Sequence, residues 1–119
     1  MPPKRPAATV TDGELTSAMF HILLTLAEGE RHGYAIMQEI ERRTAGAVEL
    51  GPGTLYRSIK QLVARGHIAE IESESTPGKQ RRSYRLTPGG KRRAAMEAQR
   101  LQGLVEWAAA ARLLHGEKA

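Results

Sequence analysis

A short stretch near the middle of the chain carries side chains suited to hydrogen bonding with nucleic acid. At 100° per residue they share one face of an expected helix, and none of them is acidic: Thr54, Arg57, Lys60 and Gln61. Arginine suits the O6 and N7 atoms of guanine, and glutamine suits the N6 and N7 atoms of adenine. Lysine and threonine suit phosphates and sugars. Solvated helix faces usually mix charges of both signs, so this pattern favours DNA contact over plain solvation.

The opposite face of the same stretch is apolar, with Tyr56 on the flank. Its stripe consists of Leu55, Ile59, Leu62 and Val63. Proline is well placed in a first helical turn, because the amide that it lacks would have no partner there. The sequence therefore predicts a third helix that is introduced by residues 51–54 and ends before Gly66.

Two helices are expected before this one. The first is predicted over about 12–28, with Thr11 and Glu14 forming a capping box and Gly29 as its stop. A turn over 30–33 then leads into a second helix, which ends at Gly46. Both show apolar residues at helical spacing.

After Gly66 the pattern changes to that of a two-stranded hairpin, predicted over 67–72 and 82–86. Tyr84 and Leu86 should face one way, and Arg85 the other. Residues 79–93 hold no acid and seven cations: Lys79, Arg81, Arg82, Arg85, Lys91, Arg92 and Arg93. We expect the bases at the tip of the hairpin to reach flanking phosphates or a minor groove. The alternative is a solubilising basic surface.

Three helices, a hairpin and a further helix make the order of a winged helix-turn-helix domain. The expected fold class is mostly α with a small β-hairpin. The expected division is a disordered basic arm over 1–10, a winged helix-turn-helix domain over 11–87 and a dimerisation helix over 88–119. That last helix is predicted to start at Thr87 and Pro88 and to run to about Leu114.

The last helix carries a stripe that one small domain does not fully cover. We expect it to pair with a second copy through Leu101, Leu104, Val105, Ala108 and Ala111. Trp107, the single tryptophan, has two interpretations. It is either a buried anchor of the dimer interface or a stacking wall for a planar hydrophobic effector.

The composition excludes several classes of function. The chain has 119 residues, a formal net charge of +5 and no cysteine, so thiol catalysis, disulfides and cysteine-ligated metals are absent. The four histidines show no metal-binding spacing, and no catalytic grouping or cofactor motif appears. No apolar run is long enough to cross a membrane, and no secretory signal is seen, so we expect a cytoplasmic protein.

Several segments together resemble the PadR family of transcriptional regulators: His32-Gly33-Tyr34, Gly51 to Tyr56, and Tyr84-Arg85-Leu86-Thr87. The resemblance covers about 15–93. It implies a winged-helix domain, a homodimer closed by the C-terminal helix, and promoter repression that a small effector relieves in some members. It also implies DNA contacts from Tyr34, Gly53, Thr54, Tyr56, Arg57 and Lys60, and from the basic wing at Lys79, Arg81 and Arg82. The chain departs from the family pattern at two places. Many members have an acidic residue after the second leucine of the third helix, where this chain has Val63-Ala64-Arg65, and many have two aromatic residues before Arg-Leu-Thr, where this chain has Ser83 and Tyr84. Both departures leave the expected fold intact.

The sequence thus predicts a non-enzymatic, sequence-specific regulator of transcription. We expect a homodimeric repressor that binds double-stranded DNA at a palindromic operator, with release by a small hydrophobic or aromatic effector as one mode of control. The alternative is a winged-helix module that binds protein and not DNA. An enzyme is a distant third, because no catalytic constellation is present.

Overall fold

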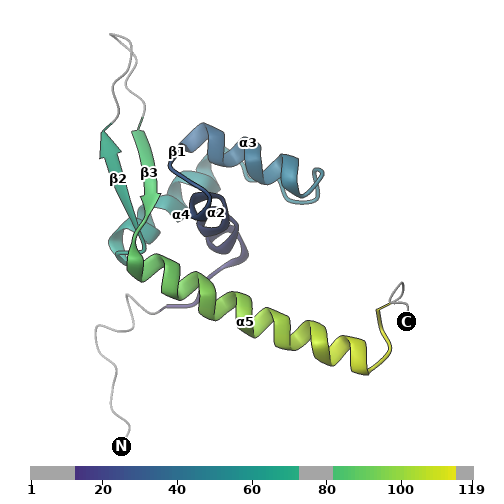
Figure 1. The fold of residues 1–119 in the computed structure, drawn as a ribbon. Coiled ribbons are helices and arrows are strands. Elements are labelled where there is room, and N and C mark those ends of the chain that lie inside the picture. The colour runs from purple at the N-terminus through teal and green to yellow at the C-terminus, as the bar shows by residue number, and fades with distance from the viewer. Residues whose placement is uncertain (1–12, 73–81, 115–119) are drawn as a thin grey trace, which may run out of the picture.

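The structure, a computed structural model, describes residues 13–72 and 82–114 (Figure 1). In chain order its elements are α2 (Ser17–Ala27), β1 (Arg31–His32), α3 (Gly33–Arg43), α4 (Pro52–Ala64), β2 (Ile68–Glu72), β3 (Arg82–Leu86) and α5 (Pro88–Ala110). The strands form one antiparallel sheet in the order β1-β3-β2. In this described part, the four helices and small sheet confirm the predicted fold class and add one strand. The predicted arm over 1–10 lies outside the described residues.

The core lies where α2, α3 and α4 meet the sheet. Every helix contributes apolar residues to it, and the most deeply buried are Met19, Ile22, Leu23, Ile36, Ile40, Leu55, Leu62 and Ile68. These residues recur at helical spacing, as the sequence predicts. Because α4 buries its apolar face here, its polar face must point away from the body.

The first helix begins later than predicted. Instead of starting near residue 12, α2 starts at Ser17, and its N-cap is Thr16, whose hydroxyl accepts a hydrogen bond from the Met19 amide at 3.1 Å. The predicted cap at Thr11 lies outside the described residues. The error arises because Leu15 is buried and extends the apolar stripe although it precedes the helix. The end agrees with the prediction, since α2 stops at Ala27 just before Gly29.

The segment predicted as a turn over 30–33 contains a strand. Arg31 pairs with Tyr84, and His32 pairs with Ser83, which adds β1 to the free edge of β3. The Ser83 hydroxyl lies 3.0 Å from Nδ1 of His32 and ties the same two strands together. A strand of two residues has no periodicity, and its partner lies about fifty residues away, so the sequence pattern could not show it.

The third helix agrees with its predicted limits. Pro52 is its first residue, and Gly66 follows it at φ +79°, a left-handed conformation that suits glycine. One predicted core residue is wrong, because Val63 is 37% exposed whereas Ser58 is buried. The face toward the core is centred on Leu55 and Leu62, which places Ser58 inside its edge and Val63 outside.

Both predicted strands of the hairpin are present, and Tyr84 and Leu86 turn inward while Arg85 is exposed. Thr87 caps α5 by accepting from the Gly90 amide at 3.0 Å. The helix ends at Ala110, four residues before the predicted Leu114, because the chain turns through Arg112 at φ +62°. No glycine marks this left-handed position, so the sequence shows no stop signal.

Only the first part of α5 lies against the body of the protein. Gly90 and Ala94 are its buried residues, and it packs on α2 and β3. Beyond them the helix projects away from the other elements (Figure 1). Of the helices that the structure describes, none is both long and apolar enough to span a membrane.

Candidate nucleic-acid interface

The outward face of α4 presents all four polar residues singled out from the sequence. Thr54, Arg57, Lys60 and Gln61 are exposed, and the helix contains no acidic residue. Leu55 and Leu62 anchor the opposite face with no exposed surface. This packing fixes the orientation of a surface that carries two cations and several hydrogen-bond donors. Such a surface can contact the phosphates and base edges of a duplex.

Gly53 lies in the first turn of α4 and is exposed. A Cβ built there would meet no atom within 4 Å. Packing within the chain therefore does not require glycine at this position, which leaves its predicted role in close approach to DNA as a prediction.

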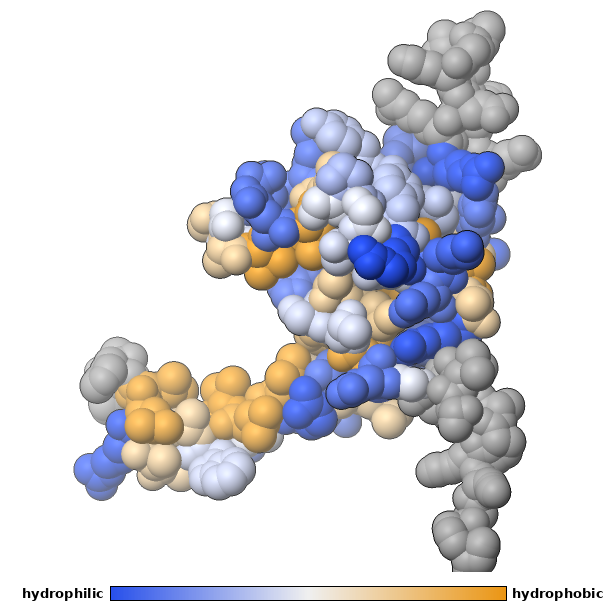
Figure 2. Space-filling view, turned by 180° about the vertical axis from the view of Figure 1, so that it is seen from behind, coloured by the Kyte–Doolittle hydropathy of each residue, from blue (hydrophilic) through white to orange (hydrophobic). Residues whose placement is uncertain are grey.

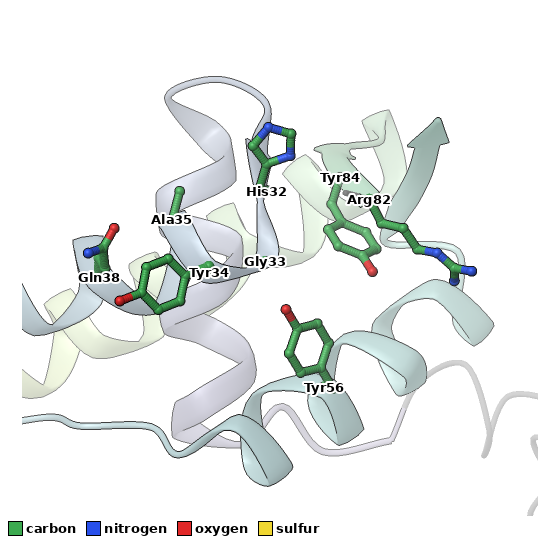
Figure 3. A pocket seen from close by; sticks show the side chains of 8 residues that line it. All are labelled: His32, Gly33, Tyr34, Ala35, Gln38, Tyr56, Arg82 and Tyr84. Carbon is green, nitrogen blue, oxygen red and sulfur yellow. The ribbon is translucent and has the colours of Figure 1, made fainter. Parts of the chain in front are cut away.

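A groove of about 550 Å³ opens where α3 begins, between α4 and β3 (Figure 3). It is lined by His32, Gly33, Tyr34, Ala35, Gln38, Tyr56, Arg82 and Tyr84. Three predicted DNA contacts from three different elements, Tyr34, Tyr56 and Arg82, are therefore neighbours in space. The groove also contains Gln38 and Tyr84, which the sequence did not single out as contacts.

The position of Tyr56 depends on a glycine of α3. A Cβ built on Gly33 would lie 2.9 Å from Cε1 of Tyr56 and closer still to its hydroxyl. Gly33 therefore lets the Tyr56 ring rest directly against the start of α3. The His-Gly-Tyr motif of the sequence thus has a packing reason that its spacing alone could not reveal.

Tyr84 is the most deeply buried side chain of the groove, at 4% exposure. Burial raises the pKa of its hydroxyl, and the nearby Glu70 and Tyr56 raise that pKa further, while Arg82 lowers it. The hydroxyl is therefore protonated at neutral pH and can donate a hydrogen bond. Arg82 is itself paired with Glu70 at 3.1 Å, with both side chains largely exposed.

The rest of the predicted basic wing is only partly described. Lys79 and Arg81 lie outside the described residues. Lys91 and Arg92 are exposed in the first turns of α5, and Arg93 is half-buried. The role of Lys79, Arg81 and Arg82 as DNA contacts stays a prediction.

The predicted dimerisation residues lie on the projecting part of α5. Within one chain Leu104 is 44% exposed, Val105 53% and Trp107 70%, while Leu101 and Ala108 are half-buried. Ala111 is the C-cap residue and not part of the helix itself. Figure 2 shows this part of α5 as an apolar arm beside a hollow of the molecule. Trp107 is thus not a core residue of a single chain.

Among residues 13–72 and 82–114, no three histidine or acidic side chains gather in a way that could hold a metal ion. An ion pair between Arg43 and Glu28 joins α3 to the C-terminal end of α2. Arg43 binds both oxygens of Glu28 at 2.7 Å, and this contact lowers the pKa of that carboxyl group. The pKa of Glu39 is lowered mainly by its bond from Arg42 at 2.6 Å, and to a smaller extent by Arg43 at 2.9 Å. Arg43 and Glu28 are both about half exposed, so the pair between them contributes little to stability.

The chain is similar to known proteins in both sequence and fold. Residues 22–96 match the Transcriptional regulator PadR-like family. Transcriptional regulator Rv3488 of Mycobacterium tuberculosis is 39% identical over 80 residues, which make up 67% of this chain and 69% of that protein. An uncharacterized 37.1 kDa protein of transposon TN4556 from Streptomyces fradiae is 37% identical over 91 residues, or 74% of this chain. The match spans only 25% of the length of that relative.

The fold also matches the crystal structure of Bacillus subtilis PadR in complex with operator DNA. The TM-score is 0.66 at 21% identity, over 71% of this chain and 48% of that chain. The matching family consists of transcriptional regulators and not of enzymes, as predicted. The match covers the winged-helix elements from α2 into α5. The chain is therefore a member of the PadR-like family of transcriptional regulators.

Proposed function

We propose that the chain is a cytoplasmic, homodimeric repressor that places α4 in the major groove of a palindromic operator. The observation that carries this proposal is the outward face of α4, where Arg57, Lys60 and Gln61 are exposed and no acid is present. A fold shared with a PadR protein in complex with operator DNA supports the same docking. In this scheme residues 11–87 bind the duplex, with the wing on its phosphates.

The proposed homodimer follows from one continuous face of α5. Gly90 and Ala94 bury this face against the body, and the same face continues outward through Leu101, Val105 and Ala108. A second copy of the chain, related by a two-fold axis, would bury the apolar stripe that is exposed in a single chain. Two chains would then offer two α4 helices to half-sites about 34 Å apart. This arrangement assigns dimerisation to residues 88–119.

Release by an effector is the remaining part of the proposal. Trp107 is 70% exposed on the same projecting arm and supplies a flat surface for a hydrophobic or aromatic compound. A compound that binds between subunits and favours one dimer geometry would change DNA affinity. Tryptophan fluorescence with a panel of aromatic compounds tests this part, and quenching by none of them would contradict it.

Replacing Arg57 with Ala tests the α4 assignment directly. If Arg57 reads a base, R57A loses about 1–3 kcal/mol of binding free energy and no longer discriminates at one base pair. The DNA upstream of the protein's own gene is first footprinted to locate the bound site. Titration of duplexes that vary at each position of that site then measures both effects.

Arg43→Ala is the matched control, because it removes one arginine whose charge Glu28 and Glu39 already neutralise. We expect R43A to keep both affinity and base preference. An R57A protein that binds every duplex like wild type would show that this face of α4 does not read the operator. It would favour the alternative, a winged helix that binds protein.

A further inference from the structure

We propose that the groove between α3, α4 and β3 is a binding site for one phosphodiester of the DNA backbone, with Tyr84 as its central donor. This inference rests on the proposed DNA-binding function and names a specific site within it. The groove is the one lined by the start of α3, Tyr56, Arg82 and Tyr84 (Figure 3). Tyr84 is not among the DNA contacts predicted from the sequence.

The first element of the site is the start of α3. Its first three residues, Gly33, Tyr34 and Ala35, all line the groove. Amides in the first turn of a helix have no partner within the helix, and they attract anions. A side chain at the N-cap often satisfies such amides, but His32 makes no capping hydrogen bond here. Its Nδ1 is instead engaged with Ser83 at 3.0 Å.

The second element is independent of the helix and comes from β3. The Tyr84 side chain is more than nine-tenths buried, yet its hydroxyl points into the groove (Figure 3). Within residues 13–72 and 82–114 no hydrogen bond of this hydroxyl is found. The ring is thus held by the core while the hydroxyl opens onto the groove, where it can donate a hydrogen bond to a ligand that accepts one.

The β1–β3 pairing explains why these two elements meet. Arg31 is opposite Tyr84, so the chain enters α3 directly beside the tyrosine. Arg82 lies two residues before Tyr84 on the same strand and therefore on the same side of the sheet. The Tyr56 hydroxyl adds a further donor from α4, held against Gly33. Three kinds of donor, namely amides, phenol hydroxyls and a guanidinium, thus converge from three elements.

The chemistry of these groups selects an anion that only accepts hydrogen bonds. None of the eight residues that line the groove is acidic, although Glu70 pairs with Arg82 from outside. A phosphodiester carries one negative charge and several acceptor oxygens, and it matches amide, phenol and guanidinium donors. Because Tyr56 joins the groove to the recognition face of α4, the expected phosphate is one of the bound duplex and not free phosphate.

Tyr84→Phe and Tyr56→Phe keep the rings and remove only the hydroxyl oxygens. We expect Y84F to weaken duplex binding about tenfold, the value of one hydrogen bond to a charged group. The loss should be equal on operator and unrelated duplexes, because phosphates carry no sequence information. Arg82→Gln should also weaken binding, whereas Arg85→Gln removes an exposed cation of the same strand and should weaken it less. Thermal unfolding confirms that each variant is folded.

A scan of duplexes with single neutral methylphosphonates identifies the phosphate. In wild type, one substitution should cost about tenfold, and the same substitution should cost Y84F little, because the bond is already lost. Wild-type affinity in Y84F, or an unchanged methylphosphonate profile, would overturn the site while DNA binding itself stands. Binding of inorganic phosphate with no effect of Y84F on DNA would also overturn it. If wild type binds no duplex, the site fails together with the proposed function.

Discussion

Arg82 has two roles in the wing, one in the groove and one in an ion pair. It lines the groove beside Tyr84, and it is paired with Glu70 at 3.1 Å across the β2–β3 ladder. Because both side chains are largely exposed, the pair contributes little to stability. Glu70 engages Arg82 in the free protein, and it therefore competes with any phosphate that approaches Arg82.

We expect Glu70→Gln to raise duplex affinity by roughly two- to fivefold, the range of one exposed ion pair. The gain should shrink at high salt, since it is electrostatic. Fluorescence anisotropy at two salt concentrations measures it. Glu106→Gln, which removes an exposed carboxylate from the projecting part of α5, is the charge-matched control and should change affinity less. Weaker binding by E70Q would show that Glu70 orients Arg82 for DNA and does not compete with it.

At the scale of elements, the start of α5 is fixed by close contact with the turn before β2. A Cβ built on Gly90 would collide with the backbone carbonyl of His67, whereas one on Gly89 would only reach ordinary contact at 3.7 Å. The hydroxyl of Thr87, the N-cap residue of α5, donates a hydrogen bond to the carbonyl oxygen of Gly66 at 2.7 Å. The direction in which α5 leaves the body is therefore set at this junction.

Substitution of the two adjacent glycines should separate packing from helix propensity. Gly90→Ala should lower the free energy of unfolding by about 1–3 kcal/mol, because backbone atoms must move to admit the methyl group. Gly89→Ala should be neutral or raise stability by up to about 1 kcal/mol, because alanine favours helix. Urea denaturation of both variants compares them. Equal stability of the two would mean that α5 is not packed tightly against this turn.

The sequence predicts elements far better than it predicts the contacts between them. Residues 82–86, Pro52 and Gly66 have strong local signals, and the structure has a strand, a helix start and a helix end there. The polar face of α4 could also be predicted, because helical geometry alone separates it from Leu55 and Leu62. The groove could not be predicted from the sequence, because it depends on two long-range contacts. These are the pairing of β1 with β3 and the packing of the Tyr56 ring against Gly33, where no Cβ blocks it.

At the scale of the whole molecule, the projecting part of α5 decides whether two α4 helices act together. Val105→Glu would place a charge in the proposed interface, where its burial without a partner is costly. We expect this variant to be monomeric at micromolar concentration and wild type to be dimeric. Light scattering reports the mass, and circular dichroism reports that the helices are retained.

Gln99→Glu makes the same change of charge on the opposite side of α5 and should leave the dimer intact. A V105E protein that stays dimeric would move the interface to another surface. A wild-type monomer at the same concentration would contradict the proposed homodimer altogether.

The central claim is that the α4 face and the groove bind DNA. It is tested most directly by the binding of the wild-type chain to a duplex from upstream of its own gene, measured by fluorescence anisotropy over a range of salt concentrations. The account predicts a preference over an unrelated duplex and a linear fall of log affinity with log salt. For six or more phosphate contacts, the loss should be about 10³-fold between about 50 and 200 mM salt. No binding, or binding that salt does not weaken, would contradict the assignment of the α4 face and the groove to DNA.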